Sequence, residues 1–175
     1  MIIKHKFRDH KISNQTKILI IGTFNPDAVK NEATFFYGRS RNFLWSLLPK
    51  VFDEESLKNK NIGAKLEFIN NYRIDFVDLI AEIEIEEGKE NNYSDEYIDC
   101  KVSRWNNIID IIKNNPIKEV YFTRKTFANI KNIKDKISSI EKYCINNKIK
   151  FSYLDTPARY ENKEKLKSWK DAFRR

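Results

Sequence analysis

Four short apolar runs divide the chain, and each is followed by polar or turn-forming residues. The first, residues 17–21 (KILII), is continuously apolar and rich in β-branched side chains. Such a run is typical of a strand that is covered on both faces within a parallel sheet. Comparable runs occupy residues 74–80, 120–122 and 150–154. We therefore predict four strands in this order.

Between these runs, apolar residues recur three or four positions apart, which is the spacing of an amphipathic helix. Segment 103–114 carries Trp105 and three isoleucines in such a stripe, which places Trp105 in the core. Thr123 is positioned to cap a helix over residues 124–133. The predicted helices cover residues 42–48, 53–71, 103–114, 124–133, 137–147 and 163–173.

This alternation predicts an α/β fold with three layers, α/β/α, around a central four-stranded, mainly parallel sheet. The 175 residues, of which 41% are hydrophobic, are enough for one domain over residues 1–175. No apolar run approaches the roughly 18 residues of a membrane span. The first residues, MIIKHK, lack the hydrophobic core of a signal peptide. We therefore expect a cytoplasmic protein.

Cys100 and Cys144 are the only cysteines, and neither has the close spacing of metal ligands. This disfavours a disulfide, a zinc site and a four-cysteine iron–sulfur cluster. The chain also lacks a glycine-rich phosphate loop such as G-x-G-x-x-G. We therefore expect neither a metal ion nor a cofactor.

Charge is distributed unevenly along the chain. The net charge is +8, yet segment 82–99 holds eight acidic residues against one lysine, a net of −7, so the remainder carries +15. Such an excess suits a partner with a phosphate backbone. A chain rich in Lys, Asn and Ile can also arise from AT-rich coding without any ligand, so charge alone leaves both interpretations open.

Candidate chemistry begins where the first strand ends. Gly22 is followed by the turn residues of segment 23–27, including Asn25 and Pro26, so the chain leaves the carboxyl edge of the sheet there. Open α/β sheets bind their ligands at this edge. Ten residues later, segment 35–39 (FFYGR) sets three aromatic residues beside a glycine and an arginine.

The combination of a strand, Gly-x-x-Asn-Pro, an aromatic loop and Arg-Asn-Phe-Leu-Trp (41–45) resembles the first motif of the uracil-DNA glycosylase superfamily. The mismatch-specific uracil/thymine and hypoxanthine-DNA glycosylase branches are the most similar. This chain has one residue more between glycine and proline than the Gly-x-Asn-Pro form. The resemblance continues at Asp78 and at Ser-Asp-Glu (94–96). Segment 155–160 (DTPARY) occupies the place of the second motif, without its histidine.

The resemblance implies a monomeric, monofunctional DNA N-glycosylase of base-excision repair over residues 1–175. It would flip a damaged or deaminated base, most readily uracil or hypoxanthine, out of DNA and hydrolyse its N-glycosidic bond. Asn25 would orient the water, Thr156 would stabilise the departing base, and Tyr37 would stack on the base. Further substrate contacts are implied for Gly22, Phe24, Pro26, Phe36, Asn42 and Pro157, and DNA contacts for Arg39, Arg41 and Arg159.

Several alternatives stand beside this interpretation. A nucleic-acid-binding protein could keep the fold without the chemistry, and the missing histidine of the second motif favours that loss. A nucleotide-processing enzyme is less well supported because the phosphate loop is absent. Asp27 could assist the water, but an aspartate after Asn-Pro more commonly caps a helix. Either His5 or His10 could reach a site, but both lie outside any motif, and such histidines are more commonly surface residues, which is what we expect here.

Overall fold

A four-stranded parallel sheet forms the centre of the computed structural model, which describes residues 1–89 and 92–174. Its strands are β2 (Ile18–Gly22), β3 (Ile74–Asp78), β6 (Glu119–Phe122) and β7 (Lys150–Tyr153), in the order β3-β2-β6-β7. All three pairings are parallel. Every residue of β2 is buried, as the continuously apolar run predicts. The four predicted strands and the fold class are confirmed.

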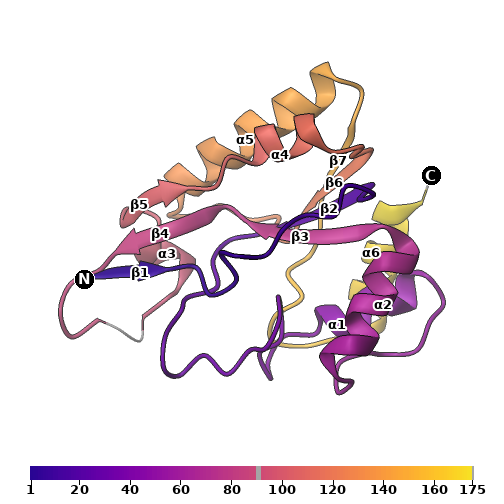
Figure 1. Ribbon diagram of the computed structural model, residues 1–175, viewed down its shortest axis with the longest axis horizontal. Helices are drawn as coiled ribbons and strands as arrows, with labels where there is room; N and C mark the ends of the chain where they lie inside the picture. Colours follow the sequence, from indigo (N-terminus) through magenta and orange to yellow (C-terminus); the bar gives the residue numbers. More distant parts are fainter. Residues whose placement is uncertain (90–91, 175) are drawn as a thin grey trace.

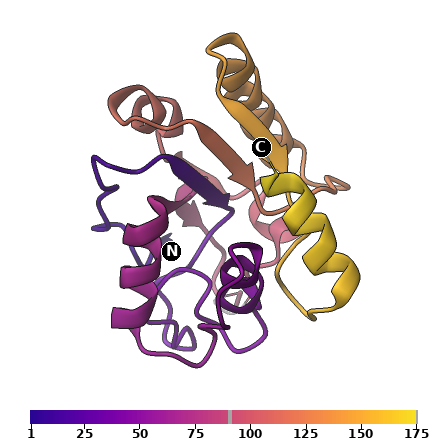
Figure 2. The same cartoon turned by 90° about the vertical axis from the view of Figure 1, so that its right-hand side faces the viewer.

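Helices cover both faces of this sheet (Figures 1 and 2). On one face, α4 (Ile108–Asn114) and α5 (Lys131–Asn146) pack on Leu19 and Ile21. On the other face, α1 (Leu44–Val51), α2 (Ile62–Tyr72) and α6 (Lys163–Phe173) enclose Ile18 and Ile20. Because successive side chains of a strand point to opposite faces, the two helical layers share β2.

A second, antiparallel sheet was not predicted from the sequence. It consists of β1 (Ile2–Lys4), β4 (Ile80–Glu84) and β5 (Val102–Trp105), in the order β1-β4-β5. Only Leu79 separates β3 from β4, so the chain passes almost directly from one sheet into the other. The short helix α3 (Asp95–Ile98) lies between β4 and β5 along the chain. Residues 90 and 91 of the polar loop before it lie outside the described residues.

Four predicted helices differ from those observed. The segment from 103 to 105 belongs to β5, where Trp105 pairs with Ile80. Helix α4 begins at Ile108, and the side chain of Asn107 caps it by accepting a hydrogen bond from Asp110 N. Residues 53–61 precede α2 and are not helical. Residues 124–130 form a connection, and one continuous helix, α5, replaces the two helices predicted over 124–133 and 137–147.

Among the described residues, no helix combines the length and the apolar character that a membrane crossing requires.

Candidate active site at the carboxyl edge of the sheet

Polar groups from two neighbouring strands and one loop converge on Gly22, the last residue of β2. Gly22 is paired with Asp78, the last residue of β3. A Cβ atom on Gly22 would overlap Asp78 Oδ1 and would lie only 2.7 Å from the Tyr37 hydroxyl. Glycine is therefore required here because the carboxylate and the phenol occupy the space above its Cα atom.

Tyr37 reaches this edge from the aromatic loop in a strained conformation. Its φ is 56°, a value that bulky L-residues rarely adopt. Its hydroxyl lies 3.2 Å from Thr123 Oγ1, and the Thr123 hydroxyl donates to the Ile21 carbonyl at 3.3 Å. Its ring meets Phe76 edge-on, with centroids 5.6 Å apart. Thr123 thus holds the tyrosine at the sheet edge and caps no helix.

The phenol of Tyr37 is a neutral hydrogen-bonding group at physiological pH. Burial raises its pKa well above the ordinary tyrosine value, and the charge of Asp78 raises it further. The Tyr37 hydroxyl and the Asp78 carboxylate therefore give the site both a hydrogen-bond donor and an acceptor.

Asp78 is buried and is held by His5, which lies 73 positions earlier in the sequence. His5 Nε2 is 2.7 Å from Asp78 Oδ2, and His5 Nδ1 accepts a hydrogen bond from the Phe7 amide at 3.0 Å. These bonds place a proton on Nε2, so the imidazole donates to the carboxylate. Only 4% of the His5 side chain and 7% of the Asp78 side chain are exposed. The prediction that His5 lies on the surface is wrong.

His10 forms a similar pair on the same strand. Its Nε2 lies 2.6 Å from Asp75 Oδ1, and the Asp75 side chain is almost fully buried. Both pairs join the N-terminal segment to β3. No local pattern in the sequence could have shown them, because the partners are separated by 73 and 65 positions.

A second carboxylate, that of Asp95, lies at the rim. Arg124 contacts both Asp95 and Glu96, and the Thr23 hydroxyl donates to Asp95 Oδ2 at 3.4 Å. Burial raises the pKa of Asp95, although Arg124 opposes that effect. These contacts join α3, the turn after β2 and the connection after β6, so three elements frame the same edge.

The loops of both sequence motifs lie side by side. The Phe43 amide donates to the Pro157 carbonyl at 2.8 Å, and the Arg159 amide donates to the Arg41 carbonyl at 2.9 Å. Arg159 has a φ of 76°, so both loops carry a strained non-glycine residue. The buried Lys165 ammonium of α6 donates to the Tyr160 carbonyl at 2.7 Å and so anchors the second-motif loop, residues 155–160.

The turn after β2 is tightly bonded. Asn25 is buried, and its Oδ1 accepts a hydrogen bond from Asn31 Nδ2 at 2.5 Å. Pro26 forms an isolated bridge with His5, and the Phe24 ring packs against the His5 ring at 6.0 Å. Asp27 begins no helix; its carboxylate pairs with Arg8 at 2.7 Å, which corrects the helix-cap prediction.

The remaining predicted residues differ in exposure. Phe36 is 3% exposed and packs on Phe76 in the core, so any effect on a substrate would be indirect. Asn42 Oδ1 accepts from the Leu44 amide at the start of α1. Thr156 is exposed, and its hydroxyl accepts a hydrogen bond from the Ala158 amide at 3.3 Å.

Three arginines lie in the loops of the two sequence motifs. Arg39, Arg41 and Arg159 are exposed, and in the described part of the chain none of them forms an ion pair. Partial burial lowers the pKa of Arg39, while the nearby charge of Asp78 opposes this change. These cations are therefore available to an anionic partner.

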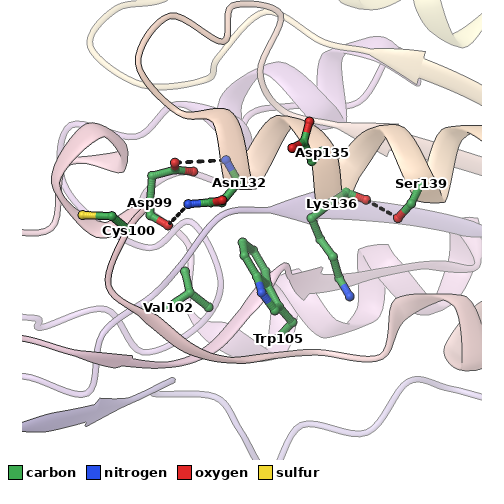
Figure 3. A pocket seen from close by; sticks show the side chains of 8 residues that line it. All are labelled: Asp99, Cys100, Val102, Trp105, Asn132, Asp135, Lys136 and Ser139. Atoms are coloured by element: carbon green, nitrogen blue, oxygen red, sulfur yellow. Dashed lines mark hydrogen bonds between the residues drawn. The ribbon is translucent and has the colours of Figure 1, made fainter.

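A separate cavity of about 490 Å³ lies between β5 and the first turns of α5 (Figure 3). Asp99 and Asp135 supply its carboxylates, and that of Asp99 accepts hydrogen bonds from the Asn132 and Ile133 amides at the start of α5. The Lys136 ammonium lies 5.8 Å from the centroid of the Trp105 ring. The Asp99 carboxylate therefore stabilises the start of a helix, and we assign no ligand to this cavity.

Comparison with known proteins supports the fold. No family model matches the chain, and no curated protein matches it. The solution NMR structure of a "putative uracil DNA glycosylase" from Methanosarcina acetivorans matches with a TM-score of 0.64 and 18% sequence identity. The match covers 93% of this chain and 92% of that one. The chain therefore has a uracil-DNA-glycosylase-like three-layer α/β/α fold.

Proposed function

We propose that this protein is a DNA glycosylase that hydrolyses the N-glycosidic bond of a flipped, damaged or deaminated base. The observation that carries the proposal is the convergence of Asp78 Oδ1 and the Tyr37 hydroxyl over Gly22, at the sheet edge where α/β folds bind ligands. The excess of positive charge and the arginines in the two motif loops support a DNA partner. The fold of the Methanosarcina protein agrees with this assignment.

Asn25 and Asp78 are the two candidates for the side chain that activates the water. Asn25 can orient a water molecule, but its Oδ1 already accepts from Asn31, and an amide cannot take up a proton. Asp78 can take up the proton, and only its Oδ2 is bound to His5. In the proposed step, water oxygen bonds to C1′, its proton passes to Asp78, and the C1′–N electron pair leaves with the base.

The departing base carries negative charge that the second loop would stabilise. The Thr156 hydroxyl is the donor that this loop offers, because Pro157 has no N–H and the amides of residues 158–160 already donate within the protein. The Pro157 carbonyl bonds this loop to the first motif. The Tyr37 ring would form the stacking surface for the base. Arg39, Arg41 and Arg159 would contact phosphates, and uracil and hypoxanthine are the first bases to test.

The test is incubation with oligonucleotides that carry uracil, hypoxanthine, xanthine or mismatched thymine, followed by alkaline cleavage. We expect excision of at least one base by the wild type, and excision of that base slowed by roughly 100-fold or more in Asp78→Asn. A borohydride-trapped covalent complex would contradict direct hydrolysis, because it would indicate a lysine Schiff base.

A catalytically silent DNA-binding protein is the second candidate. Two observations favour it: the second motif has no histidine, and the amide oxygen of Asn25 is occupied by Asn31. Salt-dependent DNA binding without excision of any tested base would select this alternative. Binding that is insensitive to salt would remove both candidates, because neutralised phosphates must release counterions.

A further inference from the structure

A second cavity shares Tyr37 with the candidate active site. It encloses about 410 Å³ between the aromatic loop and the segment before α2. Lys30, Arg39 and Lys58 line it, and Glu32 is the one acidic side chain in its wall. Three cations and one carboxylate leave this cavity with a positive charge.

Neutral hydrogen-bonding side chains complete the wall. Ser40, Asn42 and Asn59 line the same cavity. Hydroxyl and amide groups commonly contact phosphate oxygens together with Lys and Arg in nucleic-acid complexes. The lining thus matches a phosphate group better than an apolar or cationic ligand.

The cations of this cavity are not neutralised by the protein. In the described part of the chain, none of Lys30, Arg39 and Lys58 forms an ion pair, whereas the neighbouring Lys50 binds Glu161 at 2.6 Å. Lys58 is nevertheless held in place, because its ammonium lies 3.3 Å from the centroid of the Phe43 ring. A positioned but unpaired cation suits an anion that arrives from solution.

We propose that this cavity binds a backbone phosphate of the DNA strand that carries the target nucleotide. Tyr37 lines the cavity, and its hydroxyl reaches Gly22, so a phosphate here lies beside a nucleotide in the site. Arg39 can bind a phosphate in a bidentate manner, while Lys30 and Lys58 act as point charges. The placement of the strand rests on the proposed function, but phosphate binding is measured independently of excision.

The test compares two double variants with the same change in charge. Lys30→Gln/Lys58→Gln removes cations from the cavity, and Lys134→Gln/Lys142→Gln removes two exposed cations from α5. Binding of an undamaged single-stranded oligonucleotide is measured at several salt concentrations. Each lost phosphate contact should reduce the slope of log K against log salt by about 0.7.

We expect this reduction in the cavity variant and a smaller one in the α5 variant. Equal slopes in the two variants would overturn the proposal, because they would show that only net charge matters. Melting curves verify folding, and Lys58→Arg, which keeps the charge over the Phe43 ring, should retain the wild-type slope. If the cavity variant is unfolded, Lys30→Gln is compared with Lys134→Gln in the same assay.

Free phosphate is the other source of the same chemical group. Inorganic phosphate is titrated against the protein–DNA complex at constant ionic strength, and it should displace DNA from the wild type only weakly. Tight phosphate binding that the cavity variant loses, with an unchanged DNA slope, would assign the cavity to a small phosphorylated molecule and refute the strand assignment. Absence of base excision alongside the expected change in slope would refute the proposed function alone.

Discussion

Gly22→Ala tests the geometry of the candidate site directly. The added methyl would overlap Asp78 Oδ1 and approach the Tyr37 hydroxyl to 2.7 Å, so at least one of these groups must move. The backbone of β2 cannot retreat easily, because every residue of this strand is buried between two helical layers. Close packing of this kind makes even one extra methyl group costly.

The loss of stability in Gly22→Ala depends on how the neighbouring side chains move. Overpacking of a well-packed core costs about 1–3 kcal/mol. If Asp78 turns away, it also loses its 2.7 Å contact with His5, and a broken buried pair costs about 3–5 kcal/mol. Because the Cβ atom would overlap Asp78 Oδ1, Asp78 must move whether or not Tyr37 does, and we expect a loss of about 3–5 kcal/mol. For a protein of this size, that corresponds to roughly 6–20 °C in melting temperature.

Urea unfolding and calorimetry measure this loss, with Gly63→Ala as the matched control. Gly63 lies in α2, where the nearest atom to a new Cβ is Asn61 Oδ1 at 3.3 Å, and alanine favours a helix by roughly 0.5–1 kcal/mol. Gly63→Ala should therefore leave stability unchanged or raise it slightly. A Gly22→Ala protein as stable and as active as the wild type would refute the convergence of Asp78 and Tyr37 over Gly22.

Three further outcomes are expected. Asp78→Asn should slow excision by roughly 100-fold or more and leave DNA affinity nearly intact. Single-turnover rates should show whether Asn25→Ala causes an equal or a smaller loss of rate. If either folded variant excises the base at the wild-type rate, that residue does not act on the water. Tyr37→Ala should weaken capture of the base by about 1–3 kcal/mol, measured as the increase in KM, whereas Tyr37→Phe should keep most of the stacking. The free energy of unfolding should fall as pH rises above about 10, because burial raises the Tyr37 pKa and the unfolded chain then binds fewer protons than the folded chain. Urea midpoints measured from about pH 9 to 11 should decline less steeply for Tyr37→Phe than for the wild type. Equal declines in the two proteins would contradict the buried phenol.

The central sheet could be predicted from sequence because its signal is local. The runs at residues 17–21 and 150–154 are each a strand in their own right, and α6 begins and ends at the residues expected from its apolar stripe. The antiparallel sheet carries a weaker signal. Strand β5 (VSRW) has only four residues, and Trp105 continues the isoleucine stripe of α4 at helical spacing, so the two elements merge into one predicted helix.

The site could be predicted only in part, because its chemistry depends on long-range pairs. Sequence motifs identified the turn after β2 and the loops around Tyr37 and Thr156. They could not show that His5 reaches Asp78, since that contact follows from the pairing of β1 with β4, which carries the N-terminal segment alongside the end of β3. The same register makes His5, expected on the surface, one of the most buried polar residues.

This arrangement changes which residue is best suited to the chemistry. Asn25 occupies the position that the motif indicates, yet its bonds to Asn31 and Lys6 stabilise the turn itself. Asp78 extends from the neighbouring strand over a glycine, and His5 leaves one of its oxygens directed towards Tyr37 and Gly22. A carboxylate fixed in this way needs no reorganisation to accept a proton. The absence of a histidine from the second motif is therefore compatible with catalysis, provided that Asp78 supplies the base and the second loop supplies only neutral donors.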